Sequence, residues 1–169
     1  MQFHKGKKNI TNILNTIIMN VKISYTLFLA FTLLVSSIVF ISFKKQQKEE
    51  PWTQGQLLDP SDLAKTLNNS KTNQPYIYSI GPGATIKNSI DIGPGQNKEN
   101  LNKLKAQLSK LPKDANIVIY CGCCPLDHCP NIRPAFTLLN EMKFTNQKLL
   151  NLHHNIKMDW IDKGFPVNQ

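Results

Sequence analysis

Hydrophobic and polar residues alternate along the chain with two different periods, and their order predicts the secondary structure. Short apolar runs rich in β-branched and aromatic residues predict buried strands at residues 76–80, 116–120 and 148–152. Apolar residues at helical spacing predict helices at residues 60–68 and 98–111, after residue 131, and at residues 155–162. Strands that alternate with helices favour an α/β fold, a doubly wound parallel sheet with helices on both faces.

Two of these helices carry clear terminal signals. Asp59 precedes Pro60, which places a capping side chain just before a proline at the first helical position. Pro134 is compatible only with the first turn of the helix that follows residue 131. In that helix the apolar residues recur at i, i+3, i+4 and i+7, at Ile132, Ala135, Phe136 and Leu139.

A different pattern stands near the N-terminus. Residues 23–43 carry no charge and are apolar on every helical face, and a helix of this length is long enough to cross a bilayer. No small-residue cleavage site follows, so we expect an uncleaved signal anchor and a single-pass membrane protein with its soluble domain extracytoplasmic. Residues 1–22 form a basic segment before the anchor, residues 44–53 a polar linker, and residues 54–169 the folded domain.

The chain is basic, with 20 lysine and arginine residues against 11 acidic ones and a formal net charge of +9. The charges are scattered, and Arg133 is the single arginine of the sequence. No arginine-rich stripe with interleaved aromatic residues is present. The composition therefore favours no nucleic-acid partner.

All four cysteines of the chain fall within nine residues, directly after the predicted strand 116–120. When a cysteine ends a strand and is followed by a loop and a helix, the backbone N–H groups of the loop and the positive end of the helix face its sulfur. Both stabilise the thiolate form. Cysteines that serve as small hydrophobic residues or as structural disulfide partners are the alternative. The cysteines are Cys121, Cys123, Cys124 and Cys129.

Several motifs between residues 54 and 167 resemble the rhodanese-like domains. The hydrophobic strand that closes on Tyr120-Cys121 is similar to the strand that delivers the family's catalytic cysteine. Trp160 followed by Gly164-Phe-Pro-Val167 is similar to the family's closing tryptophan and tail, and Lys143-Phe144 to the end of its helix. The loop after Cys121 is longer than the family's usual loop and holds three further cysteines.

The resemblance implies a rhodanese-like fold and a sulfurtransferase without a cofactor. Cys121 would take sulfur from a small donor such as thiosulfate or a persulfide and pass it to a thiol acceptor. Cys123, Cys124 and Cys129 would be accessory thiols. Related domains of the same superfamily, phosphatases or arsenate reductases, have a longer loop that ends in arginine, so Arg133 is a candidate anion-binding residue or a surface arginine.

Other functions of the same cysteines stay open. The Cys121-x-x-Cys124 spacing, with Cys123 or Cys129 as a resolving thiol, is typical of thiol redox proteins. A metal-binding module for zinc or copper would use Cys121, Cys124 and Cys129 with His128. A catalytically silent binding domain is a further alternative.

Overall fold

The computed structural model describes Met19, Lys22, Tyr25 and residues 49–168. The chain divides into two units, residues 1–48 and residues 49–169, and the second contains the sheet. Apart from Tyr25, the anchor predicted at residues 23–43 lies outside the described residues. Among those that are described, no helix is both long enough and apolar enough to cross a membrane.

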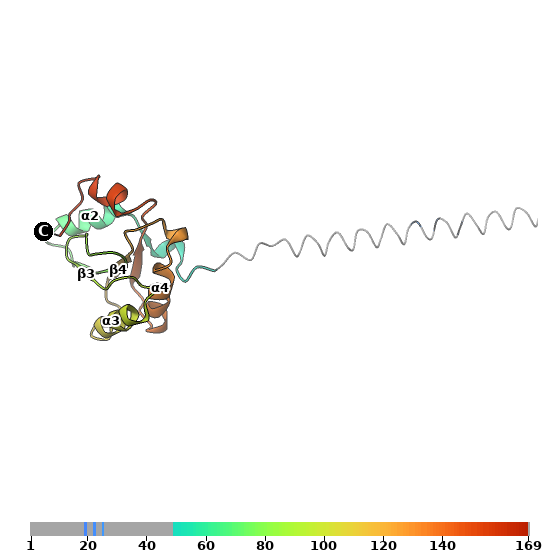
Figure 1. Ribbon diagram of the computed structural model, residues 1–169, viewed down its shortest axis with the longest axis horizontal. Coiled ribbons are helices and arrows are strands. Elements are labelled where there is room, and N and C mark those ends of the chain that lie inside the picture. Colours follow the sequence, from blue (N-terminus) through green and yellow to red (C-terminus); the bar gives the residue numbers. More distant parts are fainter. Residues whose placement is uncertain (1–18, 20–21, 23–24, 26–48, 169) are drawn as a thin grey trace, which may run out of the picture. The chain divides into compact units, whose positions relative to one another are not determined.

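The second unit is an α/β fold built on five strands that all run parallel, in the spatial order β1-β5-β4-β2-β3 (Figure 1). The three predicted strands are confirmed, and β4 is the central one. β1 and β3 were not predicted, because two and three residues are too few to show an alternating pattern. The strands are β1 (Leu57–Leu58), β2 (Tyr76–Ser79), β3 (Ser89–Asp91), β4 (Ile117–Tyr120) and β5 (Gln147–Leu150).

The helices follow the predicted positions with two differences in extent. Helix α3 ends at Leu108 rather than at residue 111, because the N–H of Leu111 bonds to the Leu108 carbonyl in a tighter turn before Pro112. The last predicted helix is shortened to a π-turn, η3. The helical segments are η1 (Gln54–Gln56), α2 (Pro60–Asn68), α3 (Lys98–Leu108), η2 (Leu126–His128), α4 (Ile132–Glu141) and η3 (Lys157–Ile161).

Capping side chains explain where two helices begin, and the first of these caps was predicted. The carboxylate of Asp59 accepts a hydrogen bond of 2.7 Å from the Ser61 N–H at the start of α2, which has Pro60 at its first position. The Asn97 side chain accepts one of 2.8 Å from the Glu99 N–H at the start of α3. Each cap satisfies an N–H that has no partner within its helix.

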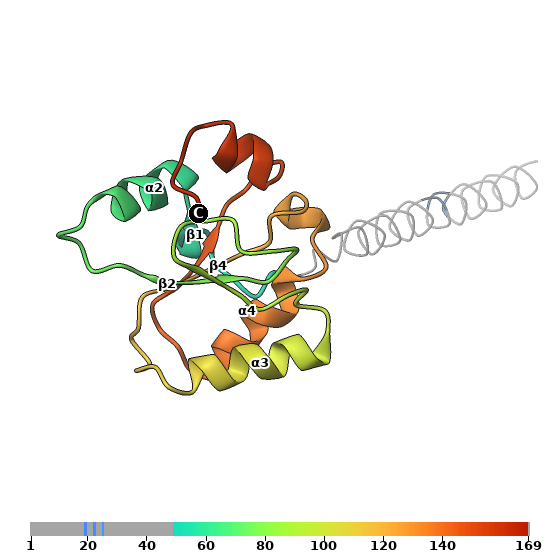
Figure 2. The same ribbon diagram turned by 60° about the vertical axis from the view of Figure 1, so that its left-hand side comes forward.

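Helices cover both faces of the sheet, as predicted. α3 and α4 lie on one side, and α2 and η3 on the other (Figures 1 and 2). Side chains of β4 alternate between the two cores: Ile119 packs with α3 and α4, and Tyr120 packs with α2 and Trp160. The next residue, Cys121, continues the alternation and joins the α3–α4 core.

The segment before β1 packs on α4. The ring of Trp52 meets that of Phe136 edge to face at a centroid distance of 5.7 Å, and the Asn140 side chain donates to the Pro51 carbonyl. Glu50 pairs with Arg133. The packed unit therefore includes residues 49–53.

The C-terminal segment packs on the face of the sheet opposite α3 and α4. Trp160 is fully buried, donates from its indole nitrogen to the Pro166 carbonyl at 2.9 Å, and packs edge to face on Phe165. Val167 forms an antiparallel bridge with Ile86, which ties the C-terminal tail to the segment before β3. A buried indole with a satisfied N–H anchors the core.

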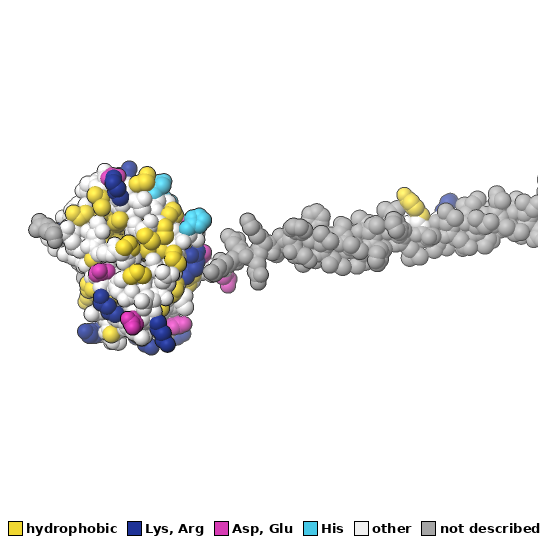
Figure 3. Space-filling model, viewed as in Figure 1, with side chains coloured by type: hydrophobic (Ala, Val, Ile, Leu, Met, Phe, Trp, Pro, Cys, Tyr) yellow, Lys and Arg dark blue, Asp and Glu magenta, His cyan; other side chains and the backbone are white. Residues whose placement is uncertain are grey.

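On the face drawn in Figure 3, charged side chains of both signs lie mostly around a broad apolar area. The exposed large apolar side chains of this unit include Tyr76, Met158 and Ile161. A mixed surface of this kind agrees with the scattered charges of the sequence.

Candidate cysteine site

Cys121 lies at the carboxyl end of the central strand. It follows Tyr120, whose carbonyl accepts a hydrogen bond of 2.9 Å from the Ile80 N–H of the neighbouring chain segment. Its side chain is 1% exposed. The carboxyl ends of strands in open parallel sheets are where such folds bind ligands, so the predicted nucleophile occupies the edge of the sheet at which chemistry is expected.

Gly81 allows the end of β2 to approach the sulfur closely. A Cβ atom on this glycine would lie 2.8 Å from the Sγ of Cys121 and 3.3 Å from its Cα. In the sequence, Gly81-Pro-Gly83 has the composition of a turn. The structure shows that the first glycine also leaves the space which the cysteine side chain fills.

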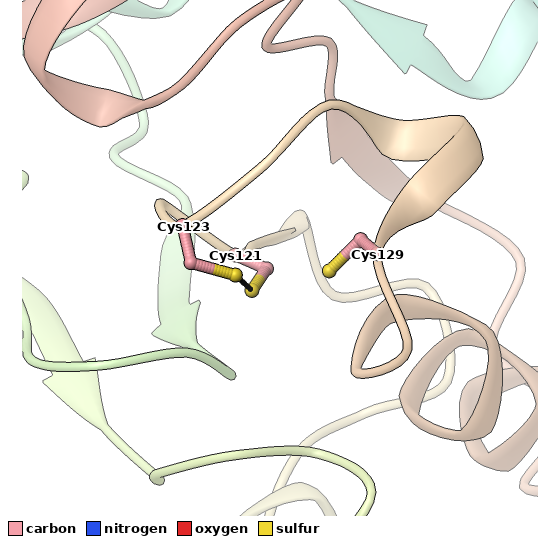
Figure 4. A group of neighbouring side chains, drawn as sticks. All are labelled: Cys121, Cys123 and Cys129. Atoms are coloured by element: carbon pink, nitrogen blue, oxygen red, sulfur yellow. Dashed lines mark hydrogen bonds between the residues drawn. The ribbon is translucent and has the colours of Figure 1, made fainter.

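The cysteine loop brings sulfur atoms together. The Sγ of Cys123 is 3.2 Å from the Sγ of Cys121 and 3.1 Å from that of Cys124. Cys129, fully buried just before α4, points its sulfur toward Cys121 (Figure 4). All four are free thiols. Of the predicted accessory thiols, Cys123 and Cys129 are therefore neighbours of Cys121 in space, and Cys124 contacts Cys123.

Asn131 connects Cys121 to the loop before α3. Its Nδ2 donates a hydrogen bond of 3.3 Å to the Cys121 sulfur, and its Oδ1 accepts one of 3.2 Å from the Gln96 N–H. The side chain is 5% exposed and makes no capping bond to its own helix. Because the Gln96 N–H can only donate, it determines which end of the amide faces the sulfur.

These surroundings favour the thiolate form of Cys121. The Cys129 thiol presents its proton to the Cys121 sulfur and is the largest cause of a lowered pKa for Cys121; burial opposes it. The Cys123 N–H, the Asn131 amide and the Cys123 thiol add further donors, and together they lower the pKa of Cys121 to about 5. The thiol is therefore almost wholly ionised at neutral pH, which is the form that reacts as a nucleophile.

The thiols of Cys129 and Cys123 stay protonated. The bond that Cys129 makes to Cys121 is the largest cause that raises the pKa of Cys129, and burial adds to it. Burial, followed by bonds to Cys124 and Cys121, raises the pKa of Cys123 to about 12. The cluster therefore holds one anionic sulfur among thiols that donate to it.

Arg133 lies on the far side of the loop backbone. Its guanidinium donates to the Cys129 carbonyl at 3.2 Å, pairs with Glu50 and lies over the ring of Trp52 at 5.6 Å. These contacts tie the end of the cysteine loop to α4 and to the N-terminal segment. The anion-binding role stays a prediction.

His128 lies outside the cluster. Its side chain is 78% exposed and its Nε2 is 3.3 Å from a carboxylate oxygen of Asp127. The three ligand atoms that lie within 4.8 Å of one another belong to Cys121, Cys123 and Cys129. The alternative metal site predicted from the sequence instead combined Cys121 and Cys129 with Cys124 and His128. Spacing along the sequence therefore did not predict which sulfurs come together.

Of two cavities among the described residues, one borders the cysteine loop and the other borders the start of α2, and neither is lined by a cysteine. One of about 420 Å³ lies between η2 and the residues after β5, and His128 and His153 contribute to it. The other, of about 330 Å³, includes His153 and Asp159. Burial raises the pKa of Asp159. Hydrogen bonds from His154, one from its Nδ1 at 3.0 Å and one from its N–H, have the larger effect together and lower this pKa.

The chain matches no known protein-family model and no curated protein. The assignment of a function thus depends on the geometry of this cysteine site.

Sequence reasoning missed Asn131 as a member of the site. Asparagine just before a helix reads as an N-cap, and that signal gives a local role. Its actual partners are Cys121, ten residues earlier, and Gln96, which lies 35 residues earlier. The sequence contained no signal that would link these three positions.

Proposed function

We propose that the protein is a rhodanese-like sulfurtransferase that carries a persulfide on Cys121. The observation that carries the proposal is the convergence of donors on one sulfur at the carboxyl end of the central strand: the Asn131 amide at 3.3 Å and the thiol of Cys123 at 3.2 Å. The Asn131 amide is held by its own bond to the Gln96 N–H, so it stabilises negative charge on sulfur without reorganisation during the reaction. The parallel α/β fold is compatible with the family that the sequence resembles.

The first step loads sulfur onto the enzyme. The Cys121 thiolate attacks the outer sulfur of thiosulfate, forming a bond from Sγ to that sulfur. The sulfur–sulfur bond of thiosulfate breaks, and sulfite leaves with the electron pair. The product is a persulfide anion on Cys121, which the Asn131 amide is positioned to stabilise.

The second step passes the sulfur on. The thiolate of an acceptor attacks the terminal sulfur of the persulfide, and the Cys121 thiolate leaves with the electron pair. A low pKa makes Cys121 a good leaving group. One sulfur atom moves from donor to acceptor, and the enzyme returns to its starting form.

Access to Cys121 runs past Cys123. Cys121 is buried whereas the side chain of Cys123 is exposed, and their sulfurs are in contact. Rotation of an exposed side chain takes picoseconds to nanoseconds and needs no backbone movement. A donor of thiosulfate size would reach the buried sulfur when Cys123 turns away.

Mass spectrometry tests the proposal. Reduced wild-type protein is incubated with thiosulfate, and the peptide that contains Cys121 should gain the mass of one sulfur atom. Cyanide should remove that atom as thiocyanate. Cys121→Ser is the matched control, since it keeps the other three thiols and should gain no sulfur. Wild-type protein that stays unloaded with both thiosulfate and a small persulfide would exclude sulfur transfer.

Thiol–disulfide exchange is a second candidate, and the contact between Cys121 and Cys123 favours it. An anionic sulfur beside a second thiol is the arrangement that resolves a mixed disulfide. Oxidation with glutathione disulfide should then give a bridge between these two residues, which peptide mapping would identify. A sulfurtransferase treated with a sulfur donor should instead accumulate the persulfide.

We also propose that residues 23–43 anchor the protein in a membrane with the domain on the extracytoplasmic side. The uncharged run of the sequence supports this placement. Fractionation followed by protease treatment of intact cells tests it. Recovery of the full-length protein in the soluble fraction would contradict it.

A further inference from the structure

Three cysteine sulfurs converge from the two ends of the loop. Cys121 and Cys123 follow β4, and Cys129 precedes α4. Their Sγ atoms all lie within 4.8 Å of one another, and Figure 4 shows the sulfurs of Cys123 and Cys129 directed toward Cys121 from opposite sides. The sulfur-transfer steps make and break bonds only at the first of these sulfurs, whereas the other two thiols serve as hydrogen-bond donors to it.

We propose that Cys121, Cys123 and Cys129 form a three-coordinate thiolate site for a soft metal ion, Cu(I). This site goes beyond sulfur transfer and does not depend on it. Thiolates are the ligands that select Cu(I) among biological metals. The three residues are contributed by one loop that is held at both ends, by β4 and by α4.

The sulfur positions suit such an ion. A thiolate sulfur lies about 2.3 Å from a metal of this size, so three sulfurs in a plane around it are about 4 Å apart. The separation of Cys121 and Cys123 is 3.2 Å, and the 4.8 Å limit holds for all three pairs. Binding would therefore need side-chain movements of less than about 1 Å.

The number of ligands favours Cu(I) over zinc. Structural zinc sites take four protein ligands. The described residues place Cys124 next to Cys123, but outside the group whose sulfurs all lie within 4.8 Å. His128 pairs with Asp127 on the exposed side of the loop. A three-sulfur site matches a metal of low coordination number.

Hydrogen bonds around the three sulfurs also support a metal site. The Asn131 amide donates to the sulfur of Cys121, and its Oδ1 is held by the Gln96 N–H. Groups that hydrogen-bond to metal ligands orient them and disperse their negative charge. Three thiolates and one Cu(I) carry a net charge of 2−, so such donors matter here. Binding releases the protons of Cys123 and Cys129 and changes no oxidation state.

The test is a competition titration with the full-length, reduced, metal-free protein under anaerobic conditions. Cu(I) is supplied as its complex with a coloured chelator, and its transfer to the protein is followed by absorbance. We expect one Cu(I) per chain and, from X-ray absorption, three sulfur ligands. Zn(II) titrated in parallel should bind more weakly and should leave Cu(I) in place.

Two variants separate ligands from neighbours. Cys123→Ser changes an exposed side chain, so the fold should persist. Loss of an outer-shell contact typically weakens metal binding by about 10- to 100-fold. Loss of a ligand should cost more, so we expect this variant to bind Cu(I) about 100-fold or more weakly than wild type. Cys124→Ser is the matched control and should bind Cu(I) within a few-fold of wild type. Equal binding by wild type and Cys123→Ser, or displacement of Cu(I) by Zn(II), would overturn the proposal.

Copper binding and sulfur loading are measured separately on the same preparations. Copper is titrated without a sulfur donor, and loading is assayed without metal. Protein that binds Cu(I) but accepts no sulfur would reject the sulfurtransferase and support the metal site. Protein that accepts sulfur but binds no Cu(I) would do the reverse.

Discussion

The side-chain amide of Asn131 donates a hydrogen bond to the sulfur of Cys121, although its position at the start of α4 would ordinarily make it a helix cap. The Gln96 N–H holds the oxygen end of the same amide. The donor that faces the sulfur is thereby fixed by a loop on the opposite side of the site. This relationship makes Asn131 a positioning residue for the thiolate.

Asn131→Asp should raise the pKa of Cys121. The substitution keeps the shape of the side chain, removes the N–H donor and places a second negative charge beside the sulfur. We expect the midpoint for alkylation of the Cys121 peptide to move upward by about 1–2 pH units. Rates of iodoacetamide labelling, measured by peptide mass across the acid and neutral range, give this midpoint.

Asn102→Asp is the control for this experiment. Asn102 is exposed on α3, so the same change of charge there should leave the midpoint in place. An unchanged midpoint in Asn131→Asp would show that the amide does not influence the thiolate.

Stability should rise with pH between about 5 and 9 and fall above that range. The pKa of Cys121 is about 5 in the folded protein against 9.0 ordinarily, so between these values the unfolded chain binds the extra proton and stability increases with pH. Above 9.0 the order reverses, because Cys123, with a pKa of about 12, and Cys129 stay protonated only in the folded state. Thermal unfolding midpoints measured as a function of pH should pass through a maximum.

Comparison with Cys121→Ser isolates the contribution of this one thiol. Serine does not titrate in this range, so the variant should lose the rise on the acid side. The fall above 9 should also become smaller, because contact with Cys121 is one of the causes that raise the pKa of Cys129 and of Cys123. A difference between wild type and variant that stays constant with pH would contradict a lowered pKa at Cys121.

Gly81→Ala should destabilise the fold and disturb the site. The added Cβ would lie 2.8 Å from the Cys121 sulfur and 3.3 Å from the Gly122 nitrogen, so backbone as well as side chain must move. Overpacking of this kind costs about 1–3 kcal/mol in the free energy of unfolding. Urea denaturation measures it. Gly55→Ala, whose Cβ would meet only the Thr53 hydroxyl at 3.9 Å, should change stability by less than about 0.5 kcal/mol.

Tyr120→Phe should lower the free energy of unfolding by about 2 kcal/mol. The buried Tyr120 hydroxyl accepts hydrogen bonds from the N–H groups of Thr85 at 2.9 Å and Ile86 at 3.2 Å. Without the oxygen both donors lose this partner at a site that water does not reach freely. Tyr76→Phe is the matched control, because the side chain of Tyr76 is 46% exposed. Equal stability of the two variants in urea would contradict this role of the hydroxyl.

Sequence patterns predicted the elements that are long enough to show a period. The apolar run before Cys121 became β4, and the capped segment after Asp59 became α2 with the expected bounds. β1 and β3 escaped prediction because they are strands only through pairing with β5 and β2. The end of α3 was misplaced because Leu111 continues the helical spacing although its backbone has left the helix.

Part of the cysteine site could likewise be predicted from the sequence, and part could not. That Cys121 follows a buried strand, and that three more thiols lie within the next eight residues, is a property of the covalent chain and could be read from it directly. Which sulfurs touch, and which group orients them, depends on contacts between segments distant along the chain. Pairing of β2 with β4 brings Gly81 to Cys121, and the placement of α4 brings Asn131 to the same sulfur. Periodicity reports only the local preference of a segment, whereas these contacts follow from the packing of segments that no local pattern relates.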